Sequence, residues 1–226
     1  MNPFGVFITI LVFFVFNKIY EKKKKFYLNP VLLSIIAVII VLQVTGIDYE
    51  AYNESAQVIS FFLGPGVVSL AVPLYKKREN VKEYILEVST GVIVGGLTAV
   101  LSVVVITWLL GGSESLIISI SPKSVTTPVA ISISEQIGGI YSLTAILVII
   151  TGILGNSVGV PILNLFKVKD PVARGIAMGV SSHVLGTERI MQESKLSGAI
   201  SGLGMALNAI FSAFIIYHVL QILPII

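Results

Sequence analysis

Long uncharged runs of apolar residues recur along this chain and predict membrane-spanning helices. A helix rises 1.5 Å per residue, so about 20 apolar residues cross a hydrocarbon core about 30 Å thick. The runs that we expect to cross are residues 3–19, 30–47, 57–75, 80–110, 140–155 and 196–223. The pattern therefore predicts an all-α, polytopic membrane protein with a bundle of six crossing helices.

Two stretches do not fit this pattern. Residues 121–139, SPKSVTTPVAISISEQIGG, are too polar for an ordinary span and too apolar for an ordinary loop, while residues 175–190 are short and contain glycines. We expect the second stretch to be a re-entrant or interfacial piece. The first either enters and leaves on one side of the membrane, which keeps six crossings, or crosses fully, which reverses the orientation of the later helices.

The third apolar run is interrupted by Gly64, Pro65 and Gly66. Proline removes a backbone hydrogen bond and glycine weakens a helix, and in lipid such a break is tolerated only inside protein or beside a wet cavity. The break is either a packing kink or a discontinuous helix at a substrate site. We favour the second, because 121–139 is another such segment and transporters with inverted repeats bring broken helices together at mid-membrane. The single domain 1–226 would then contain two candidate repeats, about 1–110 and 111–226.

Charge supports the membrane assignment and suggests an orientation. Only 12% of the 226 residues are charged and the mean hydropathy is +0.95, whereas soluble domains carry about 25% charged residues. The net charge of +3 does not indicate nucleic-acid binding, because the Lys and Arg residues cluster beside spans as in cytoplasmic loops. The clusters lie at 18–25, 76–82, 167–174 and 189–195. They predict both termini outside, and an acidic outer loop at 48–54.

Lys123 is the one basic residue outside these clusters, and it begins our candidate binding site. Thr127 and Pro128 predict a helix start, since the hydroxyl can cap backbone N–H groups and proline suits the first helical position. A helix N-terminus beside a lysine is a favourable place for an anion. The alternative is a loop lysine that reaches the membrane surface. The candidate substrate-binding residues are Lys123, Ser124, Thr126, Thr127, Pro128, Gly64, Pro65, Gly66 and Asn156.

Glu135 and His183 are candidates for proton coupling, because intramembrane acids are functional candidates and histidine titrates near neutral pH. The alternatives are a helix-end acid that faces water and a structural histidine. The chain has no cysteine and two histidines, so we expect no disulfide, metal site or cofactor. It contains no GxSxG or HExxH motif, so we expect no enzyme activity.

Four strings of the sequence resemble the LrgB/CidB family of bacterial membrane proteins. They are LGPGVVSLAVPLYKK (63–77), SPKSVTTPVAISISEQIGG (121–139), GNSVGVPILNLFKVKDPVARGIAMG (155–179) and SSHVLGTERI (181–190). PKSVTTP and DPVARG are the most specific parts, and the order of the strings is also that of the family. One departure is Glu188-Arg189, where small residues are more usual.

The resemblance implies two functions in a bacterial inner membrane. The first is transport of small monocarboxylates, since relatives are linked to pyruvate uptake and a plastid relative carries glycolate and glycerate. The second is a holin-like or antiholin-like role that modulates murein hydrolase activity and cell lysis, with a small LrgA/CidA-type membrane partner. We expect a carrier, with the holin-like role as the alternative. Glycine-rich spans also favour a homodimer.

Overall fold

In the computed structural model of the chain, the described residues are 3–23, 28–62 and 78–223, together with Pro65, Val68, Val72 and Tyr75. These residues form helices and contain no strand, as the apolar runs predict. The chain divides into two compact units, Met1–Ser69 and Leu70–Ile226. The expected halves 1–110 and 111–226 stay a prediction about repeats.

The first unit contains α1 (Phe4–Lys23), α2 (Pro30–Thr45) and α3 (Tyr49–Phe61). Two contacts join α1 to α3: the Gly5 amide donates to Ser55 Oγ (2.8 Å), and the Thr9 and Tyr52 hydroxyls bond at 2.7 Å. Helices α1 and α2 begin within one residue of the first two predicted runs, and α1 continues four residues past the predicted end at 19.

The acidic stretch at 48–54 is helical from Tyr49 on, so the prediction of a loop there is wrong, while its place on the outer side stays a prediction. Asp48 accepts a hydrogen bond from the Tyr49 amide as the N-cap of α3, and Glu50 lies in the first turn. Acidic residues at these positions stabilise a helix start, because they meet its free N–H groups and the positive end of its dipole.

Most of the predicted span 57–75, including Gly64 and Gly66, lies outside the described residues. Pro65 is helical and exposed.

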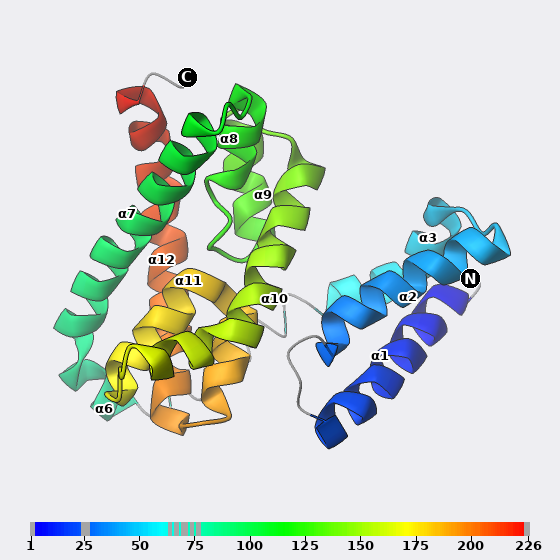
Figure 1. Cartoon of the computed structure of the whole chain (residues 1–226), viewed down its shortest axis with the longest axis horizontal. Helices are drawn as coiled ribbons and strands as arrows, with labels where there is room; N and C mark the ends of the chain where they lie inside the picture. Colours follow the sequence, from blue (N-terminus) through cyan, green and yellow to red (C-terminus); the bar gives the residue numbers. More distant parts are fainter. Residues whose placement is uncertain are drawn as a thin grey trace. The chain divides into compact units, whose positions relative to one another are not determined.

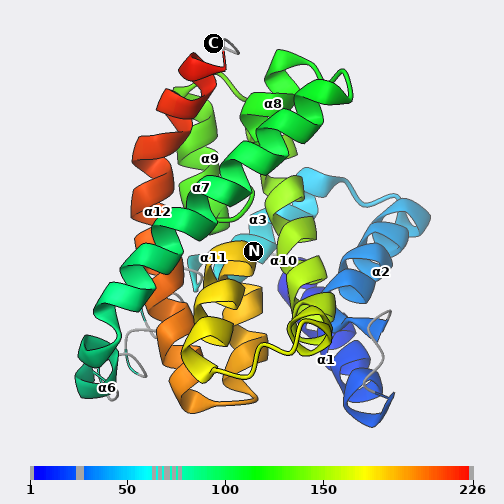
Figure 2. The ribbon, with the colours of Figure 1, turned by 60° about the vertical axis from the view of Figure 1, so that its left-hand side comes forward.

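Three long helices form the frame of the second unit: α7 (Ile85–Leu109), α10 (Tyr141–Leu165) and α12 (Lys195–Ile222). With α1, they are the four helices of the described part that are long and apolar enough to cross a membrane. All three run between the end of the unit that carries the short helix α6 (Arg78–Glu83) and the end that carries α8 (Glu114–Ile120) (Figures 1 and 2). We call the first the basic end, because Lys167, Lys169, Arg174, Arg189 and Lys195 lie there, and the second the α8 end.

Helix α10 extends ten residues beyond its predicted end at 155. Neither Gly155-Asn156-Ser157 nor Pro161 interrupts it. Tertiary contacts offset the poor helix propensity: the Asn156 amide donates to the Leu185 carbonyl (2.9 Å), and Gly155 lies against the Ser182 side chain. The predicted end at 155 is therefore too early, because these residues pack α10 against its neighbour.

Helices α8 and α9 (Thr127–Gln136) form a re-entrant hairpin that enters from the α8 end. At 1.5 Å per residue they are about 10 and 15 Å long, so neither crosses the membrane core. The Thr144 hydroxyl, in the first turn of α10, donates to the Ser119 carbonyl (2.9 Å) and contacts the Ser134 hydroxyl (2.7 Å). The last turns of both arms therefore meet the start of α10, and α9 returns to the end from which α8 enters. We call this element the first hairpin and residues 121–126 its tip.

Helix α11 (Pro171–Met191) folds back on itself and forms a second hairpin, which enters from the basic end. Ser182 and His183 have non-helical backbone angles and separate arms of about 11 and 8 residues. The arms lie against each other, since a Cβ on Gly186 would stand 2.6 Å from the Met178 carbonyl oxygen. At the base of the hairpin, Arg174 pairs with Glu193 at 2.6 Å. The expectation of a re-entrant piece near 175–190 agrees with this geometry (Figure 1).

Apolar side chains hold both hairpins against the long helices. One buried cluster joins Val104 of α7, Ile117 of α8, Ala130 of α9 and Ile216 of α12. A second cluster joins Val92 of α7 to α11 and α12. Since α7 and α12 contribute to both clusters, they form the wall on which the two hairpins pack.

Candidate functional site

The tips of the two hairpins meet at Asn208, inside α12. Its amide nitrogen donates to the Ser124 carbonyl in the first tip (3.4 Å) and to the Val180 carbonyl beside the second tip (3.2 Å). Asn208 is 1% exposed, and its Oδ1 has no hydrogen-bond partner among the described residues. Gly96 of α7 leaves room for this oxygen, because a Cβ there would stand 2.6 Å from it. One polar side chain in an apolar helix thus ties together segments that lie 84 and 28 residues away.

Lys123 lies in the first tip and is half-buried. Its ammonium donates to the Ser124 hydroxyl (3.1 Å), and the described part of the chain provides no carboxylate to pair with it. The tip therefore presents a positive charge that no protein anion neutralises in the described residues.

The start of α9 differs by one residue from the prediction. Thr126, and not Thr127, is the N-cap, and Pro128 is within the first turn. The Thr126 side chain makes no capping hydrogen bond, so within the described part of the chain the N-cap leaves the free N–H groups of the first turn without an acceptor. Ser124, Thr126 and Lys123 therefore lie next to an uncapped positive helix end.

The second tip contains His183 in a conformation that is rare for a residue with a side chain. Its backbone has φ 42° and ψ −132°, and the residue is 5% exposed. The ring Nε2–H donates to the Val148 carbonyl (3.1 Å), and the Thr187 hydroxyl donates to the His183 carbonyl (2.8 Å). Gly152 of α10 makes room for the ring, since a Cβ there would stand 2.6 Å from it. These contacts favour the structural alternative for His183, while proton coupling stays a prediction.

The predicted site residues fall into three groups in the structure. Lys123, Ser124, Thr126, Thr127 and Pro128 lie together at the first tip. Asn156 lies beside the second hairpin through its bond to Leu185. Gly64 and Gly66 lie outside the described residues, and Glu135 is exposed in the last turn of α9, away from the tip.

Arg174 has a different partner from the one that its sequence neighbours suggest. Asp170, four residues before it, does not pair with Arg174 and instead caps α11 by accepting from the Ala173 amide (2.7 Å). Arg174 donates to Glu193, to the Asn164 side chain and to the Val168 carbonyl. It thus fastens the base of the second hairpin to the end of α10.

Sequence reasoning missed Asn208 and the break at Ser182-His183. The signal that could have found Asn208 is a carboxamide in the middle of a 28-residue apolar helix, since intramembrane polar groups face the protein interior. The break has no local signal, because neither glycine nor proline occupies positions 182 and 183.

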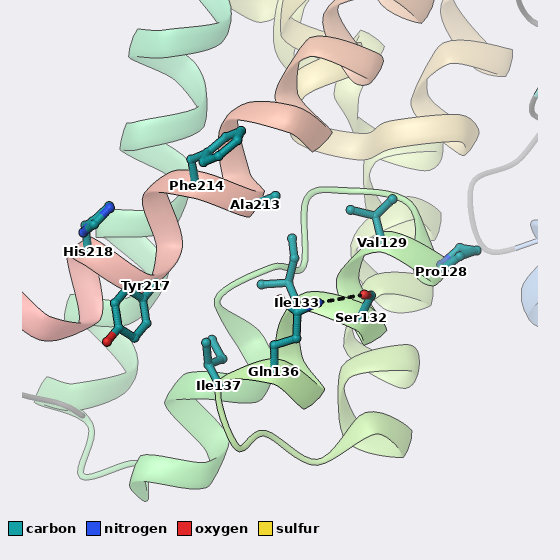
Figure 3. Close-up of a pocket in the computed structure, with 10 residues that line it drawn as sticks. All are labelled: Pro128, Val129, Ser132, Ile133, Gln136, Ile137, Ala213, Phe214, Tyr217 and His218. Atoms are coloured by element: carbon teal, nitrogen blue, oxygen red, sulfur yellow. Dashed lines mark hydrogen bonds between the residues drawn. The ribbon is translucent and has the colours of Figure 1, made fainter.

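A groove of about 610 Å³ lies elsewhere, between α9 and α12 (Figure 3). Pro128 and Ile133 contribute from α9, and Phe214 and Tyr217 from α12. Lys123 and Asn208 do not line it, so it is separate from the meeting point of the tips.

Long apolar helices that frame two opposed re-entrant hairpins in the second unit define a polytopic membrane protein with broken helices. Comparison with known proteins is consistent with this class. The model of the LrgB-like family matches residues 9–222. The chain is 35% identical over 208 residues to the uncharacterized protein YwbG of Bacillus subtilis (strain 168), covering 92% of each chain. It is 34% identical over 211 residues to the holin-like protein CidB of two Staphylococcus epidermidis strains, covering 93% of this chain and 92% of each relative.

This chain therefore belongs to the LrgB-like family, as the four strings indicate. No solved structure matches it.

Proposed function

We propose that this chain is a holin-like bacterial membrane protein whose molecular activity is the passage of a small organic anion between its two hairpin tips. The two parts of the proposal have different support. The holin-like role has the support of the relatives named CidB. Anion passage has the support of the geometry of the tips alone.

The observation that carries anion passage is the unneutralised Lys123 at the junction of two opposed hairpins. A carboxylate in a low-dielectric interior has a large desolvation cost unless it is paired or hydrogen-bonded. Lys123 offers a full charge, the uncapped start of α9 offers about half a charge, and the Ser124 hydroxyl offers a hydrogen bond. Broken helices that meet between long ones form substrate sites in secondary transporters, which makes a small monocarboxylate our choice of cargo.

The holin-like role and anion passage are compatible. Regulation of murein hydrolases and of lysis would then be the physiological outcome of moving an organic acid across the membrane. Assembly into a hole requires simple helices with small-residue interfaces. Two hairpins with a polar junction are not needed for such a hole, so the geometry favours a substrate pathway over a hole.

The test is uptake of labelled pyruvate and glycolate into proteoliposomes that contain the purified protein, alone and with a small LrgA/CidA-type partner. Lys123→Ala should abolish saturable uptake, because the carboxylate loses its only full positive charge at the tip. Lys195→Ala, which removes an exposed lysine at the basic end, should leave uptake unchanged.

Three results would change the proposal. Full uptake by Lys123→Ala would remove this residue from the pathway. Uptake only with the partner would make this chain one part of a two-protein carrier. Absence of uptake in both preparations, with murein hydrolase activity in cells still dependent on the protein, would leave the holin-like role alone.

In an active preparation, Glu135→Gln and His183→Gln should alter the pH profile of uptake if those residues couple protons.

A further inference from the structure

Asn208 uses its amide nitrogen and not its oxygen. The nitrogen carries two N–H groups, and it donates to the Ser124 carbonyl in the first tip and to the Val180 carbonyl beside the second. Its Oδ1 accepts from no described residue, and a buried polar atom without a partner lowers stability. A hydroxyl at this position has a single hydrogen and could donate to only one of the two carbonyls. The carboxamide is therefore suited to hold both tips at once.

Within the described residues, the bond from Asn208 is also the one hydrogen bond that joins the first tip to another element. The other hydrogen bonds of residues 121–126 stay inside the first hairpin. For example, the Lys123 amide donates to the Ile120 carbonyl (3.0 Å), and the Val125 amide donates to the Pro122 carbonyl (3.2 Å). Asn208 is therefore the polar contact that fixes the backbone of the first tip relative to α12.

Ser124 connects this contact to the charge of the site. Its carbonyl accepts from Asn208, and its hydroxyl accepts from the Lys123 ammonium at 3.1 Å. That hydroxyl is the only hydrogen-bond partner of the ammonium in the described part of the chain. A free lysine side chain has many rotamers, and holding it in one of them costs conformational entropy. A lysine that the protein already holds in place avoids this cost when an anion binds.

We propose that Asn208 is a positioning residue for anion passage: it holds Ser124, and Ser124 holds the Lys123 ammonium where the anion meets it. The inference rests on the proposed function, because it concerns the same site. Asn208 acts without touching the anion. Its second bond, to Val180, keeps the held ammonium at the junction of the two hairpins.

The test is the concentration dependence of glycolate and pyruvate uptake into proteoliposomes, in whichever preparation is active. Ser124→Ala removes the hydroxyl and keeps the backbone carbonyl, whereas Asn208→Ala removes the amide. Each should raise the KM for the acid roughly tenfold, because a free lysine must then be ordered when the anion binds. A purely structural role of Asn208 would instead reduce the amount of folded protein, which lowers the maximal rate and leaves the KM unchanged.

The double variant separates action through Ser124 from an independent effect. Ser124→Ala combined with Asn208→Ala should raise the KM no more than the larger of the two single effects, since both break the same chain of contacts. Thr187→Val is the matched control, because Thr187 is also fully buried and its hydroxyl bonds Ser201 of α12 from the second hairpin. Combined with Ser124→Ala, it should lower the maximal rate and leave the KM of Ser124→Ala unchanged.

Asn208→Ser is the second variant if Asn208→Ala does not fold, because a serine hydroxyl can bond a carbonyl of its own helix and cannot hold both tips. It should raise the KM as well. KM effects that multiply in the double variant, to roughly a hundredfold, would overturn the proposal. An unchanged KM in Ser124→Ala, or in a folded Asn208 variant, would also overturn it while the proposed function stands. A wild-type protein that takes up neither acid would instead remove the proposed function, and this inference with it.

Discussion

At the scale of single residues, His183 has a backbone conformation that favours glycine. Its φ of 42° is in the left-handed region, where a Cβ costs about 1–2 kcal/mol. Strained residues persist only where the surroundings hold them, and they concentrate at functional segments. The Val148 carbonyl and the Thr187 hydroxyl provide that hold here.

The strain predicts an unusual order of stability among variants of His183. His183→Ala and His183→Gly lose the same ring contacts, but only alanine keeps the Cβ. His183→Gly should therefore be more stable than His183→Ala by roughly 1 kcal/mol in the free energy of unfolding. It should also unfold at a higher temperature. Thermal unfolding of the purified variants measures this order.

Ser181, the last helical residue before the tip, provides the control for this comparison. It is exposed and has ordinary helical geometry, so Ser181→Ala should be more stable than Ser181→Gly, as is usual within a helix. If the His183 pair showed the same order as the Ser181 pair, the strain at the second tip would be disproved.

The residues of the first tip could be predicted from the sequence because their chemistry contrasts with their surroundings. Lys123 is isolated among apolar segments, and Thr127-Pro128 marks a helix start to within one residue. Asn208 could not be placed in the same way, because its two partners are 84 and 28 residues away. Local patterns do not encode contacts across such separations.

At the scale of elements, the first hairpin depends on three buried hydroxyl residues: Ser119, Ser134 and Thr144. Each is 0% exposed, and together they join the last turns of α8 and α9 to the first turn of α10. The Ile140 amide adds a hydrogen bond to Ser119 Oγ at 2.8 Å. This network fixes the returning arm and so sets where the tip lies.

Thr144→Val should destabilise this hairpin while keeping the volume of the side chain. The change removes the donor to Ser119 and leaves buried oxygens without a partner, at a cost of about 1–3 kcal/mol. Faster hydrogen exchange in residues 113–140 and a lower unfolding temperature would show it. Thr98→Val is the control, since the Thr98 side chain is exposed and its hydroxyl bonds only within its own helix. Equal effects of the two substitutions would contradict a specific role for the network.

Hydropathy predicted the long helices well and the ends of elements less well. The apolar runs located α1, α2, α7 and α12, because crossing a membrane requires length and little else. The end of α10 was missed because Gly155 and Asn156 act through contacts with α11, which offset their weak helix propensity. The start of α3 was missed because acidic residues suit a helix start as well as a loop.

At the scale of the whole molecule, the second unit has ends of unlike charge. The basic end contains five Lys and Arg residues from 167 to 195, while the α8 end contains Glu114 and Glu135 and no Lys or Arg in residues 104–122, 133–148 and 212–223. Both hairpins return to the end from which they enter, so α7, α10 and α12 alone set the orientation of this unit. The positive-inside rule then predicts that the basic end lies in the cytoplasm.

The absence of cysteine from the chain makes this orientation simple to test. Glu114→Cys and Lys195→Cys introduce thiols at exposed positions of the α8 end and the basic end. In intact cells, a membrane-impermeant maleimide should label the variant with Glu114→Cys, and it should label the one with Lys195→Cys only after permeabilisation. The reverse labelling would mean that the unit has the opposite orientation.

The position of Asn208 in α12 also has a consequence for biosynthesis. Both hairpins precede α12 in the chain, so the ribosome completes them before Asn208 exists. Until α12 enters the membrane, the Ser124 and Val180 carbonyls lack the amide that joins them. Since synthesis proceeds at about 5–20 residues per second, nascent protein should pass through a stage of some seconds in which both hairpins are formed but not yet joined. At that stage, membrane chaperones and quality-control proteases would act on the incompletely assembled protein.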